Sequence, residues 1–189
     1  MDLVDKKASG KKNRGRIIAL CGIFTALIIV GTFIRIPIPG VPFTLQFFFV
    51  NLSALVLGKR WGTLSVFVYI ILGLAGIPVF ASGGGPDYIF RPTFGYLLGF
   101  IVGTIIAGTV YEGNKSVKNA IKASILNMLT VYAVGIIYYY LISRYHLGEV
   151  KGLHYLVFGS SLVTLPGDII SCVITANISK HLSKIIDKQ

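Results

Sequence analysis

Long apolar runs separated by short polar segments dominate the pattern along this 189-residue chain. Residues 17–34 carry no ionisable group except the thiol of Cys21, and residues 41–58 carry none. A helix rises about 1.5 Å per residue, so about 20 apolar residues are needed to cross the roughly 30 Å hydrocarbon core of a bilayer. The pattern therefore predicts an all-α integral membrane protein.

The apolar runs predict six transmembrane helices with the N- and C-termini in the cytoplasm. Their approximate bounds are 16–35, 44–57, 61–77, 92–111, 120–142 and a last helix that begins at Tyr155 or Pro166 and ends at Leu182. Residues 58–60 alone separate the second helix from the third. We expect a tight hairpin there, because one continuous helix would hold Lys59 and Arg60 deep in lipid.

This organisation divides the chain into one membrane domain and two short ends. We expect residues 1–15 to form a basic cytoplasmic tail, residues 16–183 a single six-helix membrane domain, and residues 184–189 a second cytoplasmic tail. The basic start and the apolar run after it do not resemble a signal peptide, because the run is long and no small-residue cleavage site follows.

Composition and charge support the same topology. Only 13% of the residues are charged, against about 25% in soluble domains. With six helices, the cytoplasmic segments hold 14 of the 18 lysines and arginines, as expected of cytoplasmic loops. The net charge of +11 therefore needs only anionic lipid headgroups as partners, and we expect no nucleic-acid partner.

Motifs for enzyme chemistry are missing from the sequence. No phosphate-binding G-x-x-x-x-G-K-[ST] string is present. His146, His154 and His181 lack the spacing of metal ligands, and no carboxylates are paired for acid–base work. Cys21 and Cys172 lie inside predicted helices, where buried thiols are expected rather than a disulfide. We expect no enzyme, no metal and no cofactor.

Polar residues gather instead at the predicted outer ends of the helices. A glycine cluster at residues 83–85 joins the third helix to the fourth, and the polar side chains near it in the predicted topology are Thr44, Gln46, Ser82, Arg91, Tyr96 and Asp168. Phe43, Phe47 and Phe80 add apolar surface. Ligand pockets are largely apolar with a few convergent polar groups, so this end is the predicted binding site.

Each of these residues also has a purely structural interpretation. Asp168 can complement the dipole of a helix that starts at Pro166, and Arg91 can extend toward the interface as a loop cation. Thr44 and Gln46 can cap a helix. The glycines can form part of the pocket wall and a lid, or a flexible connector only. A stripe of small residues, Ala19, Gly22 and Ala26, permits close helix packing, either inside the bundle or with a partner.

Four strings carry a resemblance to a known family. They are "IPIPGVPFTLQFFFVNLSALVLGKRWG" (36–62), "GLAGIPVFASGGG" (73–85), "RPTFGYLLGF" (91–100) and "LPGDII" (165–170). Together they resemble the BioY family, the biotin-binding S components of energy-coupling-factor (ECF) transporters. The resemblance implies six helices in a bacterial plasma membrane and high-affinity capture of biotin from outside. The implied partners are a membrane-embedded coupling subunit and two ATP-binding cassette ATPases. Alternatives are an S component for another small vitamin and a scaffold without a ligand.

The resemblance also implies roles for individual residues. It assigns the acceptor of the biotin ureido N–H groups to Asp168, places Ser171 where the family commonly has a lysine, and places Ser82 where an asparagine is frequent. It favours docking of the coupling subunit on the small-residue stripe. The expected substrate-binding set is Phe43, Thr44, Gln46, Phe80, Ser82, Gly83, Arg91, Tyr96, Asp168 and Ser171.

Overall fold

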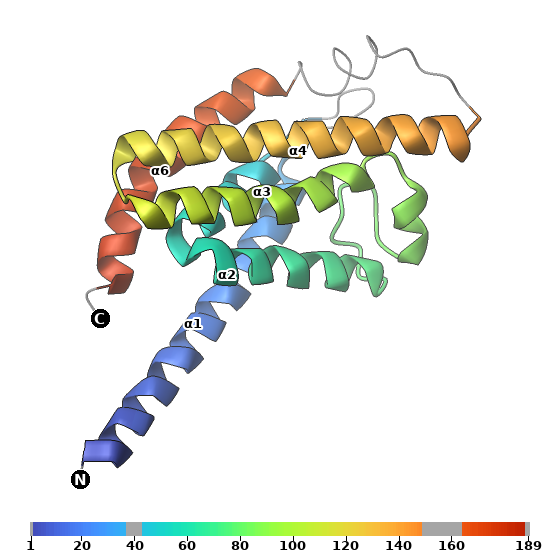
Figure 1. The fold of residues 1–189 in the computed structure, drawn as a ribbon. Coiled ribbons are helices and arrows are strands. Elements are labelled where there is room, and N and C mark those ends of the chain that lie inside the picture. Colours follow the sequence, from blue (N-terminus) through green and yellow to red (C-terminus); the bar gives the residue numbers. More distant parts are fainter. Residues whose placement is uncertain (1, 37–42, 149–163, 188–189) are drawn as a thin grey trace.

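The protein is a bundle of long helices in a computed structural model that describes residues 2–36, 43–148 and 164–187 (Figure 1). The helices are α1 (Asp2–Phe33), α2 (Gln46–Leu74), α3 (Phe94–Gly113), α4 (Val117–Tyr145) and α6 (Leu165–Asp187), with a short 3-10 helix η1 (Pro86–Phe90). A two-residue ladder pairs β1 (Arg35–Ile36) with β2 (Phe43–Thr44). The predicted all-helical class is confirmed.

Four helices in the described part of the chain are long and apolar enough to cross a membrane. They are the Arg14–Phe33 part of α1, and all of α2, α3 and α4. The alternative start of the last helix at Tyr155 lies outside the described residues. The structure instead begins α6 at Leu165, which places Pro166 in its first turn, where a missing N–H is harmless.

The predicted break near residues 58–60 is present, although Gln46–Leu74 is a single helical element. Gly58 interrupts it with φ +76°. The end of α1 contacts residues near both ends of α2. Gly31 packs on Leu45, just before α2 begins, and the Thr32 hydroxyl lies 3.3 Å from that of Tyr69, in the last part of α2. The chain therefore doubles back at Gly58, and Lys59 is exposed beside the break.

Most helix bounds differ from the prediction by two or three residues, and two differ by more. α1 begins at Asp2 rather than near Arg16, and α6 continues to Asp187 beyond Leu182. Hydropathy locates only the part of a helix that crosses lipid, whereas the helix itself continues until a helix-breaking residue stops it. Neither the start of α1 nor the end of α6 contains a proline. α2 begins at Gln46, after β2 (Phe43–Thr44) and the turn residue Leu45.

Glycines bring α3 and α4 into close contact. Gly95, Gly99 and Gly103 follow one another at a spacing of four on α3, and a Cβ on any of them would collide with Tyr138, Val131 or Asn127 on α4. Such stripes of small residues let membrane helices approach closely. Both cysteines are buried and free, as predicted.

A buried polar network joins three helices in the middle of the bundle. The Asn51 amide on α2 donates to Ser124 Oγ on α4 at 2.8 Å and to Thr175 Oγ1 on α6 at 2.7 Å. The Asn127 amide donates back to Asn51 Oδ1 at 3.1 Å. All four side chains are fully buried, so these bonds hold the helices together where no water is available.

Candidate ligand-binding site

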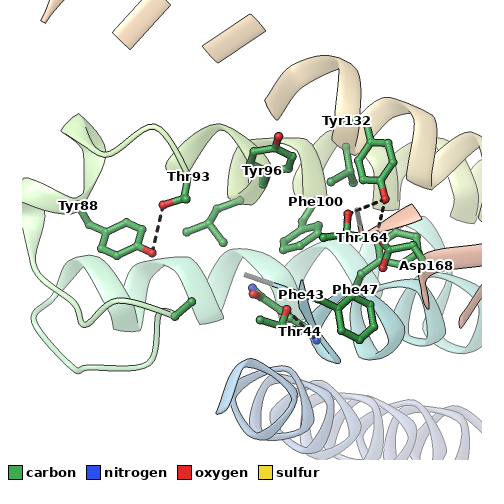
Figure 2. A pocket seen from close by; sticks show the side chains of 14 residues that line it. Phe43, Thr44, Phe47, Tyr88, Thr93, Tyr96, Phe100, Tyr132, Thr164 and Asp168 are labelled. Carbon is green, nitrogen blue, oxygen red and sulfur yellow. Dashed lines mark hydrogen bonds between the residues drawn. The ribbon is translucent and has the colours of Figure 1, made fainter. Parts of the chain in front are cut away.

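A cavity opens among α2, η1, α3, α4 and the start of α6 (Figure 2). Its volume, with the open mouth included, is about 660 Å³, and its lining consists of Phe43, Thr44, Gln46, Phe47, Ala81, Tyr88, Thr93, Tyr96, Leu97, Phe100, Val131, Tyr132, Thr164 and Asp168. Because this volume includes open solvent, the lining residues rather than the size indicate what the cavity can bind.

Aromatic and aliphatic side chains form most of the cavity wall. Figure 2 shows Phe43 and Phe47 on one side, and Tyr88, Tyr96 and Phe100 along the other. The Thr93 hydroxyl is 3.4 Å from that of Tyr88. A wall of this kind favours a ligand with a substantial apolar body.

One corner of the cavity is strongly polar. Asp168 lies in the first turn of α6 and is only 6% exposed. The Tyr132 hydroxyl from α4 donates to Asp168 Oδ2 at 2.5 Å, and Thr164 Oγ1 lies 3.0 Å from the same tyrosine oxygen. A buried carboxylate that accepts hydrogen bonds from Tyr132 and Thr164 still has lone pairs for ligand donors. The corner can therefore bind N–H or O–H groups.

A second polar group in the cavity lining comes from the start of α2. Gln46 is 5% exposed, and its Nε2 makes no hydrogen bond of good geometry within the described residues, although the side chain lies near the Tyr69 hydroxyl. Burying an unpaired N–H is unfavourable, so this amide is a ready donor for a ligand carbonyl. Its backbone N–H lies 3.4 Å from Thr44 Oγ1, a long contact that gives only weak support to helix capping.

Half of the residues predicted for the site lie together in this lining, namely Phe43, Thr44, Gln46, Tyr96 and Asp168. The other half does not. Phe80 is buried behind Tyr88, with ring centroids 4.5 Å apart. Ser82 is exposed, and the exposed Arg91 guanidinium lies 5.3 Å from the Tyr88 ring centroid.

Ser171 and Gly83 also lie outside the lining. Ser171 is buried one turn below Asp168 on α6. Gly83 closes a tight turn in which it exchanges two backbone hydrogen bonds with Phe80, at 2.9 and 3.1 Å. Its φ of +112° favours glycine. The turn presents neighbouring Ala81, rather than a glycine, to the cavity.

The sequence did not reveal the contributions of α4 and η1 to the cavity. Tyr132 and Val131 lie in the middle of a long apolar run, and no local signal distinguishes them from lipid-facing neighbours. Tyr88 follows the glycine cluster, and its position there is the one hint to its role. No group of three metal-ligating side chains lies close together in the part of the chain that the structure describes.

Comparisons with known proteins identify relatives over nearly the whole chain. The model of the BioY family matches residues 6–188. The chain is 36% identical to "Probable biotin transporter BioY" of Lysinibacillus sphaericus, over 89% of this chain and 87% of that protein. It is 49% identical to "Biotin transporter BioY" of Thermotoga maritima, over 61% of this chain and 69% of that one.

A solved structure has the same fold. The crystal structure of the S component for biotin from an ECF-type ABC transporter superposes with a TM-score of 0.78 at 28% identity, and the match covers 92% of this chain and 93% of that one. The resemblance to the family therefore extends from local strings to the entire helical arrangement.

Proposed function

This chain belongs to the BioY family, and we propose that it is the biotin-binding S component of an ECF-type vitamin transporter in the bacterial plasma membrane. The observation that carries the proposal is the cavity: a mainly apolar wall, one buried carboxylate and one unpaired amide donor. The names of the relatives and of the solved structure support the same ligand.

Biotin matches the chemistry of this cavity group by group. Its ureido ring presents two N–H donors and one carbonyl acceptor, and its thiophane ring and valeryl chain are apolar. Asp168 is the proposed acceptor for a ureido N–H, a charge-assisted bond, and Gln46 Nε2 the proposed donor to the ureido carbonyl. The aromatic side chains surround the apolar part. The carboxylate tail is then left to the open mouth.

We propose six transmembrane segments with both chain ends in the cytoplasm. The reversal of α2 at Gly58 separates two antiparallel halves, and Figure 1 shows this break, the α3–α4 turn and the end of α6 at one end of the bundle. Exposed Lys59, Arg60, Lys115 and Lys118 lie at the break and the turn, which supports a cytoplasmic location. The cavity then faces outside.

The proposed partners are a membrane-embedded coupling subunit and two ATPases. Ala19, Gly22 and Ala26 are all exposed on α1, and a Cβ added to Gly22 would meet no atom within 4 Å. This surface is therefore free for a second membrane helix to approach closely. We propose the stripe as the docking face.

Isothermal titration of the detergent-purified protein with biotin tests the proposal. We expect a dissociation constant in the nanomolar range, about −12 kcal/mol, because a preformed cavity meets a small ligand with several polar contacts. A dissociation constant above about 10 μM would reject biotin. Tight binding of another vitamin would then indicate an S component for that vitamin. If no vitamin bound, a scaffold without a ligand would be favoured.

A further inference from the structure

We infer that Tyr132 is a positioning residue that, together with Thr164, makes the Asp168 corner of the cavity accept hydrogen bonds only and so selects a ligand N–H. The inference rests on the proposed function and extends it to specificity. The three side chains come from two elements, α4 and the start of α6, and Figure 2 shows them converging at one end of the cavity.

The directions of the hydrogen bonds follow from the number of available protons. The Tyr132 hydroxyl has one hydrogen, and it is donated to Asp168 Oδ2 at 2.5 Å. In the 3.0 Å contact between Tyr132 and Thr164, only Thr164 can then be the donor. The Thr164 hydroxyl also lies within hydrogen-bonding reach of the Asp168 carboxylate, so its single hydrogen serves the tyrosine oxygen or the carboxylate.

These contacts within the protein use up the hydroxyl hydrogens of both Tyr132 and Thr164. What remains for a ligand is acceptor capacity, chiefly the second oxygen of the Asp168 carboxylate. The corner therefore binds an N–H donor and leaves a carbonyl placed there without a partner, which is unfavourable in a buried site. Such a penalty is how polar sites reject close analogues.

The bond from Tyr132 also restricts the orientation of the carboxylate. Asp168 is 6% exposed, and a hydrogen bond to one oxygen holds the other in a defined direction. Without that bond the carboxylate can rotate among several orientations, and part of the binding free energy is then spent on ordering it. Tyr132 thus acts on the ligand through Asp168.

The test compares Tyr132→Phe with the matched variant Tyr140→Phe. Tyr140 lies two turns further along α4, and its hydroxyl accepts from Arg144 at 2.6 Å outside the cavity lining. Biotin and biotin methylated on either ureido nitrogen are titrated into each protein. We expect Tyr132→Phe to weaken biotin binding about tenfold or more, with Tyr140→Phe binding like the wild type.

The relative losses of affinity for biotin and for its methylated analogues show whether Tyr132 positions Asp168 or only fills space in the cavity wall. The analogue methylated at the nitrogen that faces Asp168 already lacks the N–H contact, so Tyr132→Phe should weaken its binding much less than that of biotin. Equal losses for biotin and both analogues would overturn the inference, as would unchanged biotin binding by Tyr132→Phe. If the wild-type protein failed to bind biotin, the proposed function would fail and this inference with it.

Thr164→Val provides an independent variant in case Tyr132→Phe does not fold. It removes one hydroxyl donor and leaves the bond from Tyr132 to Asp168 in place, so we expect a smaller loss of biotin affinity, about threefold, with the same selectivity for the N–H contact. The double variant lacks both hydroxyl donors that hold the carboxylate, so it should bind biotin at least as weakly as Tyr132→Phe. Tighter binding by the double variant than by Tyr132→Phe would overturn the joint role of the two hydroxyls.

Discussion

Asp168 has a structural role and a proposed binding role, and a single substitution can separate them. As a side chain in the first turn of α6, it complements the helix dipole, an effect of about 0.3–1 kcal/mol. As a 6% exposed carboxylate in the cavity lining, it offers a charged acceptor to a ligand. Loss of the charge therefore costs the helix at most about 1 kcal/mol, whereas it removes the charged acceptor that the proposed ligand needs.

We predict that Asp168→Asn weakens biotin binding at least tenfold, about 1.4 kcal/mol, and changes the melting temperature little. Asparagine has the same size and can still accept from Tyr132, but it brings a neutral amide to the ligand. Titration calorimetry and thermal unfolding of the same preparation measure both effects. A variant that binds normally but melts early would show that Asp168 serves the helix and not the ligand.

At the level of the elements, the reversal within α2 depends on one glycine. Gly58 has φ +76° and ψ −179°, a conformation open almost only to glycine. The Lys59 backbone N–H just after the break donates to Glu112 Oε1 on α3 at 2.9 Å. The Lys59 ammonium lies 3.9 Å from the other oxygen of the same carboxylate. The turn thereby places two halves of α2 side by side.

We expect Gly58→Ala to destabilise the protein by about 1–3 kcal/mol. The new Cβ would be strained and would collide with the Glu112 carboxylate, which would weaken the bond to Lys59. Gly22→Ala is the matched control, because Gly22 is helical and a Cβ there meets no atom within 4 Å; it should be neutral or stabilising. Thermal unfolding in detergent compares the two, and equal melting temperatures would contradict the role of Gly58.

At the scale of the whole molecule, two different surfaces serve two proposed partners. The cavity lies among α2, α3, α4 and α6, whereas the small-residue stripe lies on the exposed face of α1. Because the stripe residues are exposed rather than packed inside the bundle, a bulky side chain there can be accommodated without overpacking. Ligand binding and partner docking are therefore expected to be separable by mutation.

We predict that Gly22→Trp or Ala26→Trp abolishes ATP-driven biotin uptake in cells that depend on this transporter while the purified protein still binds biotin. The indole would block close approach by a second membrane helix, so the partner subunits should no longer co-purify. Ile137→Trp is the control, because Ile137 on α4 is 60% exposed and lies away from the stripe. Unimpaired uptake in the Gly22 and Ala26 variants would remove α1 from the docking face.

The sequence by itself determined the class of protein, the order of its helices and the break in α2. These features depend on local properties: the length of each apolar run, the absence of charge within it, and the glycine followed by two charged residues at positions 58–60. It also located part of the cavity lining, because Phe43, Thr44, Gln46, Tyr96 and Asp168 lie close to helix ends, where polar residues stand out from an apolar chain.

Only the tertiary structure decided which residues from the middle of the helices complete the site. In a soluble helix, the apolar stripe marks the face that points inward, but lipid and protein interior are both apolar, so α4 shows no such contrast around Tyr132. The partners of that hydroxyl, Thr164 and Asp168, are more than 30 positions away. Their meeting depends on how α4 and α6 pack, which no local pattern encodes.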